Sequence, residues 1–283
     1  MSVTWTGERF VPSLRTETAL AHLHRYAFAQ SFVEGKRVLD IACGEGYGSR
    51  ILSRKAASVI GVDIDRDVIE HASRMYGAEN IKFLAGSVER IPLEDAAVDV
   101  VVSFETIEHT DKHREMLNEI KRVLVPGGAL IISSPDKLHY TDETGFKNPY
   151  HVKELYREEF LELLQNSFRE VSILDQMTLL ASALVPRTGV QRFLEYRGNA
   201  REITEAPHLS KPHFVVCVCS NQAVNIGEVS LFDGSDIARE LQDAHYRAIQ
   251  QIYASPVYQV GRWVSLPFRL LGRGLKALKV RHA

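Results

Sequence analysis

A strand, a glycine-rich turn and the start of a helix follow one another within residues 38–53. The first part is a short apolar run that ends with Asp40, Ile41 and Ala42, and the helix begins at Ser49. Gly44 and Gly46 have no Cβ, so the backbone can bend sharply and a ligand can approach it closely. This order of elements is typical of the first unit of a doubly wound α/β sheet, where ligands bind at the carboxyl ends of the strands.

The spacing and the charge of this turn disfavour a dinucleotide. Ser49 stands where a G-x-G-x-x-G motif has its third glycine, and Asp40 would repel a pyrophosphate bound at the helix N-terminus. A carboxylate at the strand end suits a ligand that carries an amino group and no phosphate. The pattern Asp-x-Ala-x-Gly-x-Gly over residues 40–46 resembles motif I of class I S-adenosylmethionine-dependent methyltransferases, with Ala42 in place of the usual first glycine.

Two further strands extend this resemblance. The second strand, Ser58–Asp63, ends in an acid 17 residues after Gly46, a position from which a carboxylate can hydrogen-bond a ribose diol. Adenosine has this diol in NAD and in S-adenosylmethionine, so Asp63 supports a nucleoside without choosing between them. The third strand, Ile81–Ala85, leads to Ser87, where the family often has an aspartate that binds the adenine amino group.

The fourth and fifth strands complete the matching region. The fourth strand is Asp99–Phe104, and the helix after it is predicted to open within residues 105–109. A Pro-Gly-Gly stretch at residues 126–128 precedes the fifth strand, Ala129–Pro135, as in this methyltransferase superfamily. The resemblance therefore covers residues 38–135 and implies S-adenosylmethionine as the cofactor.

A set of cofactor-binding residues follows from these positions and from a helix expected over Glu17–Phe32. In that helix, the functional interpretation is that Arg25 pairs with the carboxylate of the cofactor; the alternative is a polar helix face. The predicted cofactor-binding residues are Arg25, Tyr26, Asp40, Ala42, Gly44, Gly46, Asp63, Ile64, Ser87, Val88, Phe104 and Glu105.

Methyl transfer to a hydroxyl is helped by a base with a pKa near neutrality, and histidine is the natural candidate. His109 follows the fourth strand, near the expected position of the methyl group, and His151 follows the fifth strand in the sequence Asn-Pro-Tyr-His. We predict one of these two as the catalytic residue. His139 lies between them, and a structural role is the alternative for each. No metal ligands are expected, because Cys43, Cys217 and Cys219 have no metal-binding spacing.

The composition is that of an ordinary globular protein. The chain has 283 residues, of which 45% are apolar and 25% are charged, with a net charge of −2. We expect an α/β fold with a doubly wound, mostly parallel, seven-stranded Rossmann-like methyltransferase sheet, helices on both faces and a helical C-terminal extension. The expected parts are an N-terminal arm (1–35), a methyltransferase domain (36–222) with a partly helical insertion that caps the pocket (176–212), and a basic amphipathic extension (223–283).

The charge and the C-terminal tail bear on partners and location. A near-neutral chain has no general attraction to nucleic acid, and the three thiols suggest a reducing cytoplasm. Basic residues alternate with large apolar ones from Tyr258 to Val280, which suits either the inner face of an anionic membrane or docking onto a second copy of the chain.

The acceptor has no fingerprint of its own in the sequence. The combination of Gly-Glu-Arg-Phe-Val-Pro (7–12), His-Leu-His-Arg-Tyr (22–26) and Ser-Phe-Glu-Thr-Ile-Glu-His (103–109) resembles small methyltransferases of bacterial polysaccharide and glycolipid biosynthesis. This implies O-methylation of a sugar hydroxyl in a glycan or glycolipid precursor. Alternatives are another small-molecule acceptor, an NAD-dependent oxidoreductase, or a catalytically inactive binding protein with this fold.

Overall fold

The computed structural model describes residues 17–178, 181–187, 193–198, 203–224, 226, 229–256 and 258. It divides into two units, residues 1–234 and residues 235–283. The second unit contains the helix α6 (Ser235–Ala254), as the sequence predicted. Most of the basic tail from Tyr258 to Val280 lies outside the described residues. In the part of the chain that the structure describes, no helix is both long and apolar enough to cross a membrane.

The first unit is built on a nine-stranded sheet with the order β11-β7-β6-β10-β5-β4-β1-β2-β3. Strands β1 to β5 pair in parallel, and the four pairings from β5 to β11 are antiparallel. The strands are β1 (Arg37–Ile41), β2 (Ser58–Asp63), β3 (Ile81–Ala85), β4 (Val98–Phe104), β5 (Leu124–Pro135), β6 (Glu170–Thr178), β7 (Ala181–Pro186), β10 (Phe214–Ser220) and β11 (Ser230–Asp233).

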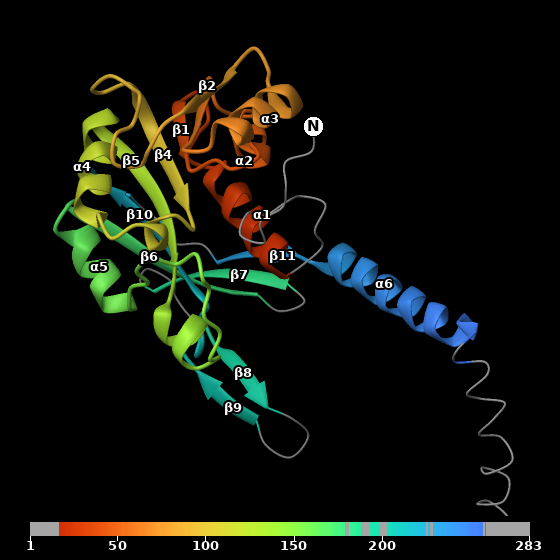
Figure 1. Ribbon diagram of the computed structural model, residues 1–283. Coiled ribbons are helices and arrows are strands. Elements are labelled where there is room, and N and C mark those ends of the chain that lie inside the picture. The colour runs from red at the N-terminus through yellow and green to blue at the C-terminus, as the bar shows by residue number, and fades with distance from the viewer. Residues whose placement is uncertain are drawn as a thin grey trace, which may run out of the picture. The chain divides into compact units, whose positions relative to one another are not determined.

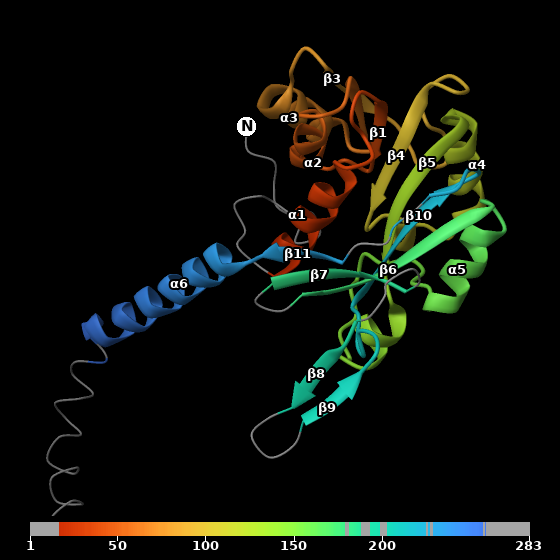
Figure 2. The same cartoon turned by 180° about the vertical axis from the view of Figure 1, so that it is seen from behind.

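Helices cover both faces of this sheet, as predicted (Figures 1 and 2). The helices α1 to α3 pack on one face, and α4 and α5 pack on the other. Alternating side chains of β10 serve the two faces, with Cys217 and Cys219 in one apolar cluster and Val216 and Val218 in the other. The helices are α1 (Glu17–Ala29), α2 (Tyr47–Leu52), α3 (Arg66–Tyr76), α4 (His113–Val123) and α5 (Arg157–Gln165).

The sheet is larger and more mixed than the predicted seven-stranded, mostly parallel one. The additional strands are β7 and β11, which extend the edge beyond β6. β7 arises within the predicted insertion at 176–212, whose described residues otherwise form the antiparallel pair β8 (Glu195–Gly198) and β9 (Ile203–Ala206). The predicted helix in this segment is therefore wrong for the described residues. β11 belongs to the sheet, although its residues were assigned to the C-terminal extension.

Two other local differences lie near the cavity. The predicted opening of a helix within residues 105–109 is instead a single 3-10 turn, η1 (Ile107–His109), and α4 begins only at His113. After β5 the chain forms a short π-helical turn, η2 (Leu138–Asp142). By contrast, α3 begins as predicted, because the Asp65 side chain caps it by accepting hydrogen bonds from the amides of Asp67 and Val68.

Helix α1 is attached to strands from the far end of the sequence. The ring of His24 is buried, with Nδ1 2.9 Å from Oγ of Ser182 in β7 and Nε2 3.0 Å from Oγ of Ser230 in β11. The amide of Gln176 in β6 donates to the carbonyl of Ala21 at 3.0 Å. These contacts join the N-terminal helix to the antiparallel edge of the sheet.

Candidate functional site

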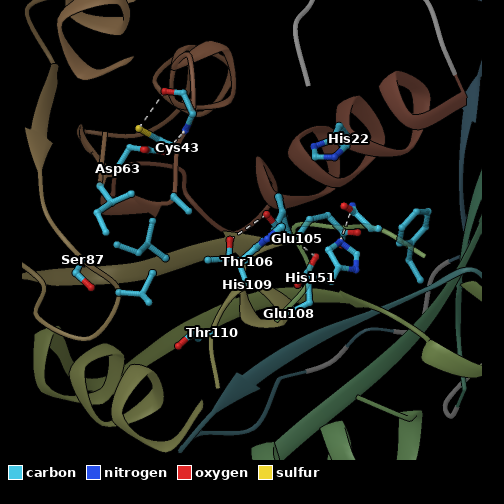
Figure 3. A pocket seen from close by; sticks show the side chains of 18 of the residues that line it. His22, Cys43, Asp63, Ser87, Glu105, Thr106, Glu108, His109, Thr110 and His151 are labelled. Atoms are coloured by element: carbon cyan, nitrogen blue, oxygen red, sulfur yellow. Dashed lines mark hydrogen bonds and ion pairs between the residues drawn. The ribbon is translucent and has the colours of Figure 1, made fainter. Parts of the chain in front are cut away.

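A cavity of about 480 Å³ lies at the carboxyl ends of β1, β2 and β4 (Figure 3). The last residues of these strands, Ile41, Asp63 and Phe104, all line it. This is the edge at which a doubly wound sheet binds its ligands, and the volume is in the usual range of about 300–1,000 Å³ for small-molecule sites. The cavity therefore occupies the position that the sequence predicted.

The turn between β1 and α2 forms one wall of the cavity. Ala42, Gly44 and Gly46 all have positive φ angles, of 59°, 54° and 89°. The left-handed conformation of Ala42 explains why a glycine is usual at this position, since a side chain there costs roughly 1–2 kcal/mol. Gly46 does not line the cavity but has no room for a side chain, because a Cβ would lie 2.7 Å from the ring of Phe83.

Asp63 faces the cavity and is held in place by backbone amides. Its Oδ2 accepts a hydrogen bond from the amide of Gly44, and its Oδ1 accepts one from the amide of Asp65, both at 3.0 Å. These bonds fix the carboxylate between two neighbouring strand ends. The arrangement suits recognition of a ribose diol, and this role of Asp63 stays a prediction.

Asp40 lies elsewhere than predicted. It is only 1% exposed and does not line the cavity. Its Oδ1 accepts from the hydroxyl of Tyr26 at 3.1 Å and its Oδ2 from that of Ser49 at 2.6 Å. Burial raises the pKa of Asp40 to about 7 and holds the pKa of the Tyr26 hydroxyl well above its ordinary value. Asp40 does not reach the cavity for the expected contact with a ligand amino group, because both oxygens hold α1 and α2 to the end of β1.

The predicted role of Arg25 is wrong in this structure for a similar reason. The guanidinium is completely buried, and its Nη1 donates to Oε1 of Glu105 at 2.9 Å and to Oε1 of Gln176 at 3.3 Å. It also lies over the ring of Phe214, 4.8 Å from the centroid. Glu105 lines the cavity and also accepts from Oγ of Ser133 at 2.6 Å. Arg25 thus acts through Glu105, which it orients and neutralises.

The other predicted cofactor residues are brought together on the cavity wall. Ser87, after β3, accepts a hydrogen bond from the amide of Glu89 at 3.1 Å, which orders the loop expected to face adenine. The predicted cofactor residues that line the cavity are Tyr26, Ala42, Gly44, Asp63, Ile64, Ser87, Val88, Phe104 and Glu105.

Both candidate catalytic histidines line the cavity and contact each other. The ring centroids of His109, in η1, and His151, in the connection between β5 and α5, are 5.1 Å apart with a near-perpendicular arrangement. Nδ1 of His109 is 3.1 Å from the backbone carbonyl of Tyr150. A carbonyl can only accept, so this nitrogen carries the proton, and Nε2 is the basic nitrogen of the neutral ring.

The protonation of His151 follows from its neighbours. Its Nδ1 is 2.5 Å from Oε1 of Glu154, and its Nε2 is 3.0 Å from Nδ2 of Asn148. The Asn148 amide is oriented because its Oδ1 accepts from the amide of Tyr150 at 3.0 Å. Nε2 of His151 therefore accepts from Asn148, and Nδ1 donates to Glu154.

Sequence reasoning missed four residues that lie in or next to the part of the cavity formed by His109 and His151. Tyr140 stacks on the ring of His151, with the centroids 5.7 Å apart and the planes 25° apart. The others are Glu108, Asn148 and Glu154. The spacing of Asn148, His151 and Glu154 at intervals of three residues is a signal that could have identified two of them. Tyr140 and Glu108 have no comparable signal.

The charge of the cavity wall tests which cofactor fits. The described lining residues include four acids, Asp63, Glu89, Glu105 and Glu108, and no lysine or arginine. Two of these acids form ion pairs with cations outside the lining, Glu89 with Lys112 and Glu105 with Arg25. Such a wall disfavours a pyrophosphate, which normally binds to a helix N-terminus or to basic side chains. It suits a ligand with a sulfonium and an ammonium group, so the residues present fit S-adenosylmethionine better than NAD.

Comparisons with known proteins point to the same family. Residues 39–132 match the model of a methyltransferase domain. The chain is 36% identical over 169 residues to a probable S-adenosylmethionine-dependent methyltransferase of Mycolicibacterium smegmatis, covering 59% of this chain and 65% of the relative. It is 33% identical over 165 residues to one of Mycobacterium tuberculosis, covering 57% of this chain and 60% of the relative. The chain therefore spans slightly less than two thirds of the length of these relatives.

A shorter match and the solved structures add to this. A fatty-acid O-methyltransferase of Mycolicibacterium smegmatis is 34% identical over 108 residues, which is 38% of this chain and 39% of the relative. The structure of a SAM-dependent methyltransferase from Archaeoglobus fulgidus has a TM-score of 0.52 at 20% identity, covering 73% of this chain and 94% of that one. At this identity the structural similarity shows the fold alone.

Proposed function

We propose that this chain, whose residues 39–132 match the model of a methyltransferase domain, is an S-adenosylmethionine-dependent enzyme that methylates a sugar hydroxyl in a glycan or glycolipid precursor. The observation that carries the cofactor assignment is the acidic wall of the cavity, with four carboxylates and no lysine or arginine among the described lining residues. The acceptor assignment rests on the sequence resemblance and on the histidine pair.

The residues of the cavity divide the chemistry between its two ends. When bound, S-adenosylmethionine supplies a methyl group on a positively charged sulfur. Asp63 would bind the ribose diol, and Glu105 would face the positive charge of the cofactor. His109 or His151 would activate the acceptor hydroxyl by taking its proton, since an uncharged alcohol is a poor nucleophile. Alignment of the acceptor with the methyl group supplies much of the remaining acceleration.

A smaller cavity suits the rest of the acceptor. It has a volume of about 270 Å³ and shares Tyr140 and Phe214 with the main cavity. Its wall also includes Phe146, and aromatic faces of this kind bind the apolar faces of large organic acceptors. The relative named as a fatty-acid O-methyltransferase supports a second candidate, a lipid hydroxyl or carboxyl group.

The cytoplasmic location and the membrane contact remain proposals that rest on the sequence. A basic apolar tail at the inner face of a membrane would bring the enzyme close to a lipid-linked acceptor. The competing use of the tail, docking onto a second copy of the chain, is distinguished by salt, because head-group attraction is screened and apolar packing is not.

Calorimetric titration with S-adenosylhomocysteine tests the proposal. We expect one site per chain, no competing binding of NAD, and a loss of about 1–3 kcal/mol of binding free energy in Asp63→Ala, because the ribose hydroxyls would lose their partner. Asp67→Ala is the matched control: this exposed acid lies in the first turn of α3 and should leave affinity unchanged. Binding of NAD in place of S-adenosylhomocysteine would instead identify an oxidoreductase.

Transfer of a labelled methyl group separates an enzyme from a binding protein. We expect label in a glycan or lipid fraction from the native host, and much less with His109→Ala or His151→Ala at equal cofactor affinity. If the cofactor binds but neither glycans nor lipids accept the label, the chain is a binding protein with a methyltransferase fold.

A further inference from the structure

Three side chains with metal-binding atoms meet at the acceptor end of the main cavity. They are Glu108 and His109 from η1, and His151 from the connection between β5 and α5 (Figure 3). One carboxylate oxygen and one nitrogen from each ring lie within 4.8 Å of one another. Nε2 of His109 is 4.0 Å from Oε1 of Glu108. All three residues line the cavity, so a ligand can reach the space between them.

In each histidine, Nδ1 is held by an oxygen acceptor of the protein. Nδ1 of His109 donates to the backbone carbonyl of Tyr150, and Nδ1 of His151 donates to the carboxylate of Glu154. Histidines that bind metals show this arrangement, because a carbonyl or carboxylate fixes the tautomer and makes the other nitrogen more basic. In both rings the basic nitrogen is Nε2.

Glu108 contributes a buried carboxylate to this cluster. Its side chain is 1% exposed, and it lines the cavity together with the two rings. Opposite charges attract each other more strongly at such a buried position than in water, which favours cation binding there.

We propose that Glu108, His109 and His151 bind a divalent first-row transition ion, with Zn²⁺ as the preferred occupant. Two imidazoles and one carboxylate form a ligand set that suits zinc, iron or cobalt, whereas magnesium and calcium require mainly oxygen ligands. Three protein ligands leave a position open for another molecule, as in catalytic zinc sites.

Binding requires a small closure of the three side chains. Ligand atoms at about 2.0–2.2 Å from a zinc ion are roughly 3–3.5 Å apart, so a separation of 4.8 Å in the cluster must shorten by about 1.3–1.8 Å. Nε2 of His151 must also exchange its hydrogen bond with Asn148 for the ion. A single hydrogen bond between neutral groups is much weaker than the binding of zinc to a three-ligand site.

The role of the ion rests on the proposed function. The open position faces the part of the cavity that we assign to the acceptor, so a hydroxyl bound there would lose its proton more easily. The histidines would then activate the hydroxyl through the ion and not as free bases. The sequence analysis expected no metal ligands on the basis of the cysteine spacing. It did not consider Glu108, His109 and His151 together, since more than 40 residues separate the first two from the third.

Metal binding is measured on the untagged full-length chain after treatment with a chelator. Co²⁺ replaces Zn²⁺ as a coloured probe, and its visible absorption reports nitrogen and oxygen ligands. We expect one ion per chain and displacement of Co²⁺ by Zn²⁺. The variants Glu108→Gln, His109→Ala and His151→Ala should each weaken Co²⁺ binding by about a hundredfold or more, because each removes a direct ligand.

The matched control is His139→Ala. His139 lies in the same β5–α5 connection, and its Nδ1 is 3.3 Å from Oε2 of Glu143, so it also forms a histidine–glutamate pair. This variant should bind Co²⁺ like the parent. His109 is about one-third exposed, so His109→Ala should fold even if a substitution of the buried Glu108 does not.

Titration with S-adenosylhomocysteine separates this proposal from the proposed function. Cofactor binding that persists while Co²⁺ binding is lost in the three variants supports the metal site. If Co²⁺ does not bind to the parent chain, or binds as tightly after His109→Ala and His151→Ala, the metal site is wrong. If the parent chain binds Co²⁺ but not S-adenosylhomocysteine, the result supports the metal site and contradicts the proposed function.

Discussion

The two ends of the main cavity are built in different ways. At the end that we assign to the cofactor, here called the cofactor end, the turn after β1 and the acid at the end of β2 are close in the sequence, and backbone amides fix Asp63 in place. At the end that we assign to the acceptor, here called the acceptor end, side chains from η1 and from the β5–α5 connection meet, and side-chain contacts orient His151. The cofactor end is therefore determined mainly by backbone conformation, and the acceptor end by side-chain identity.

This difference indicates which changes each end can tolerate. A cofactor site made from a turn and a strand end depends on glycines and on the packing beneath them. An acceptor site made from side chains on a long connection can change its specificity by substitution without disturbing the sheet. Three predictions test this contrast, from the largest expected effect to the smallest.

The largest effect concerns Asp40, which is buried behind the cofactor end and accepts hydrogen bonds from Tyr26 and Ser49. Burial raises its pKa from 3.8 to about 7. The unfolded chain loses this proton near pH 4, whereas the folded chain keeps it up to about pH 7, so stability should fall as the pH rises through this window. The loss approaches roughly 4 kcal/mol above pH 7 and is absent below pH 4.

Urea unfolding at pH 5 and pH 8 measures this effect. Asp40→Asn is neutral at both pH values and can keep hydrogen bonds with Tyr26 and Ser49, so its stability should depend less on pH than that of the parent. Asp67→Asn, at an exposed site, is the control for removing a carboxylate. Parallel pH profiles for the parent and Asp40→Asn would mean that Asp40 is already ionised in the folded state at low pH.

The next effect is that of Gly46→Ala. The residue has φ of 89°, and its new Cβ would press on the ring of Phe83. Left-handed strain of roughly 1–2 kcal/mol and overpacking of about 1–3 kcal/mol should together lower the unfolding free energy by about 2–5 kcal/mol.

Gly35→Ala separates these two contributions. Its φ is also positive, at 67°, but nothing lies within 4 Å of the added Cβ, so only the strain remains. Thermal or urea unfolding of both variants gives the difference. If the two variants are destabilised equally, the packing around Gly46 can accept a Cβ. The cofactor end would then not depend on tight packing beneath its glycines.

The smallest effect is at the acceptor end. Glu154→Gln keeps an oxygen near Nδ1 of His151 but removes its charge, so methyl transfer should fall by roughly tenfold, about 1.4 kcal/mol. The affinity for S-adenosylhomocysteine should not change, because Glu154 does not line the cavity. Glu143→Gln, in the same connection, is the control. A change in cofactor affinity with Glu154→Gln would show that the two ends are coupled.

The sequence predicted the parts of the fold whose signals are local. The first three strands, the cap at Asp65 and helix α6 follow from short apolar runs, turn residues and helical periodicity. The edge strands β7 and β11 could not be predicted in the same way. Each is short and gains its stability from pairing with strands that are distant in the sequence, and no local pattern encodes such a partner.

The same distinction holds for the site. Asp63 and Gly44 were placed correctly on the cavity wall, since a strand end and the turn beside it must face the same edge. Arg25 and Asp40 were misplaced because their burial depends on Glu105, Gln176 and Ser49, which only the folded chain brings together. Both charged residues lie near a motif and were interpreted as ligand contacts, whereas in the folded chain they form hydrogen bonds that orient neighbouring side chains.

The attachment of α1 through His24 has a consequence for synthesis on the ribosome. The partners of His24 lie 158 and 206 residues later in the chain, at Ser182 and Ser230. A nascent chain can therefore form β1 to β5 well before α1 finds its final position. Because Tyr26 and Phe104 line the cavity and their rings contact each other, the cofactor site should mature only after β11 has left the exit tunnel. Contacts of such long range form late in folding.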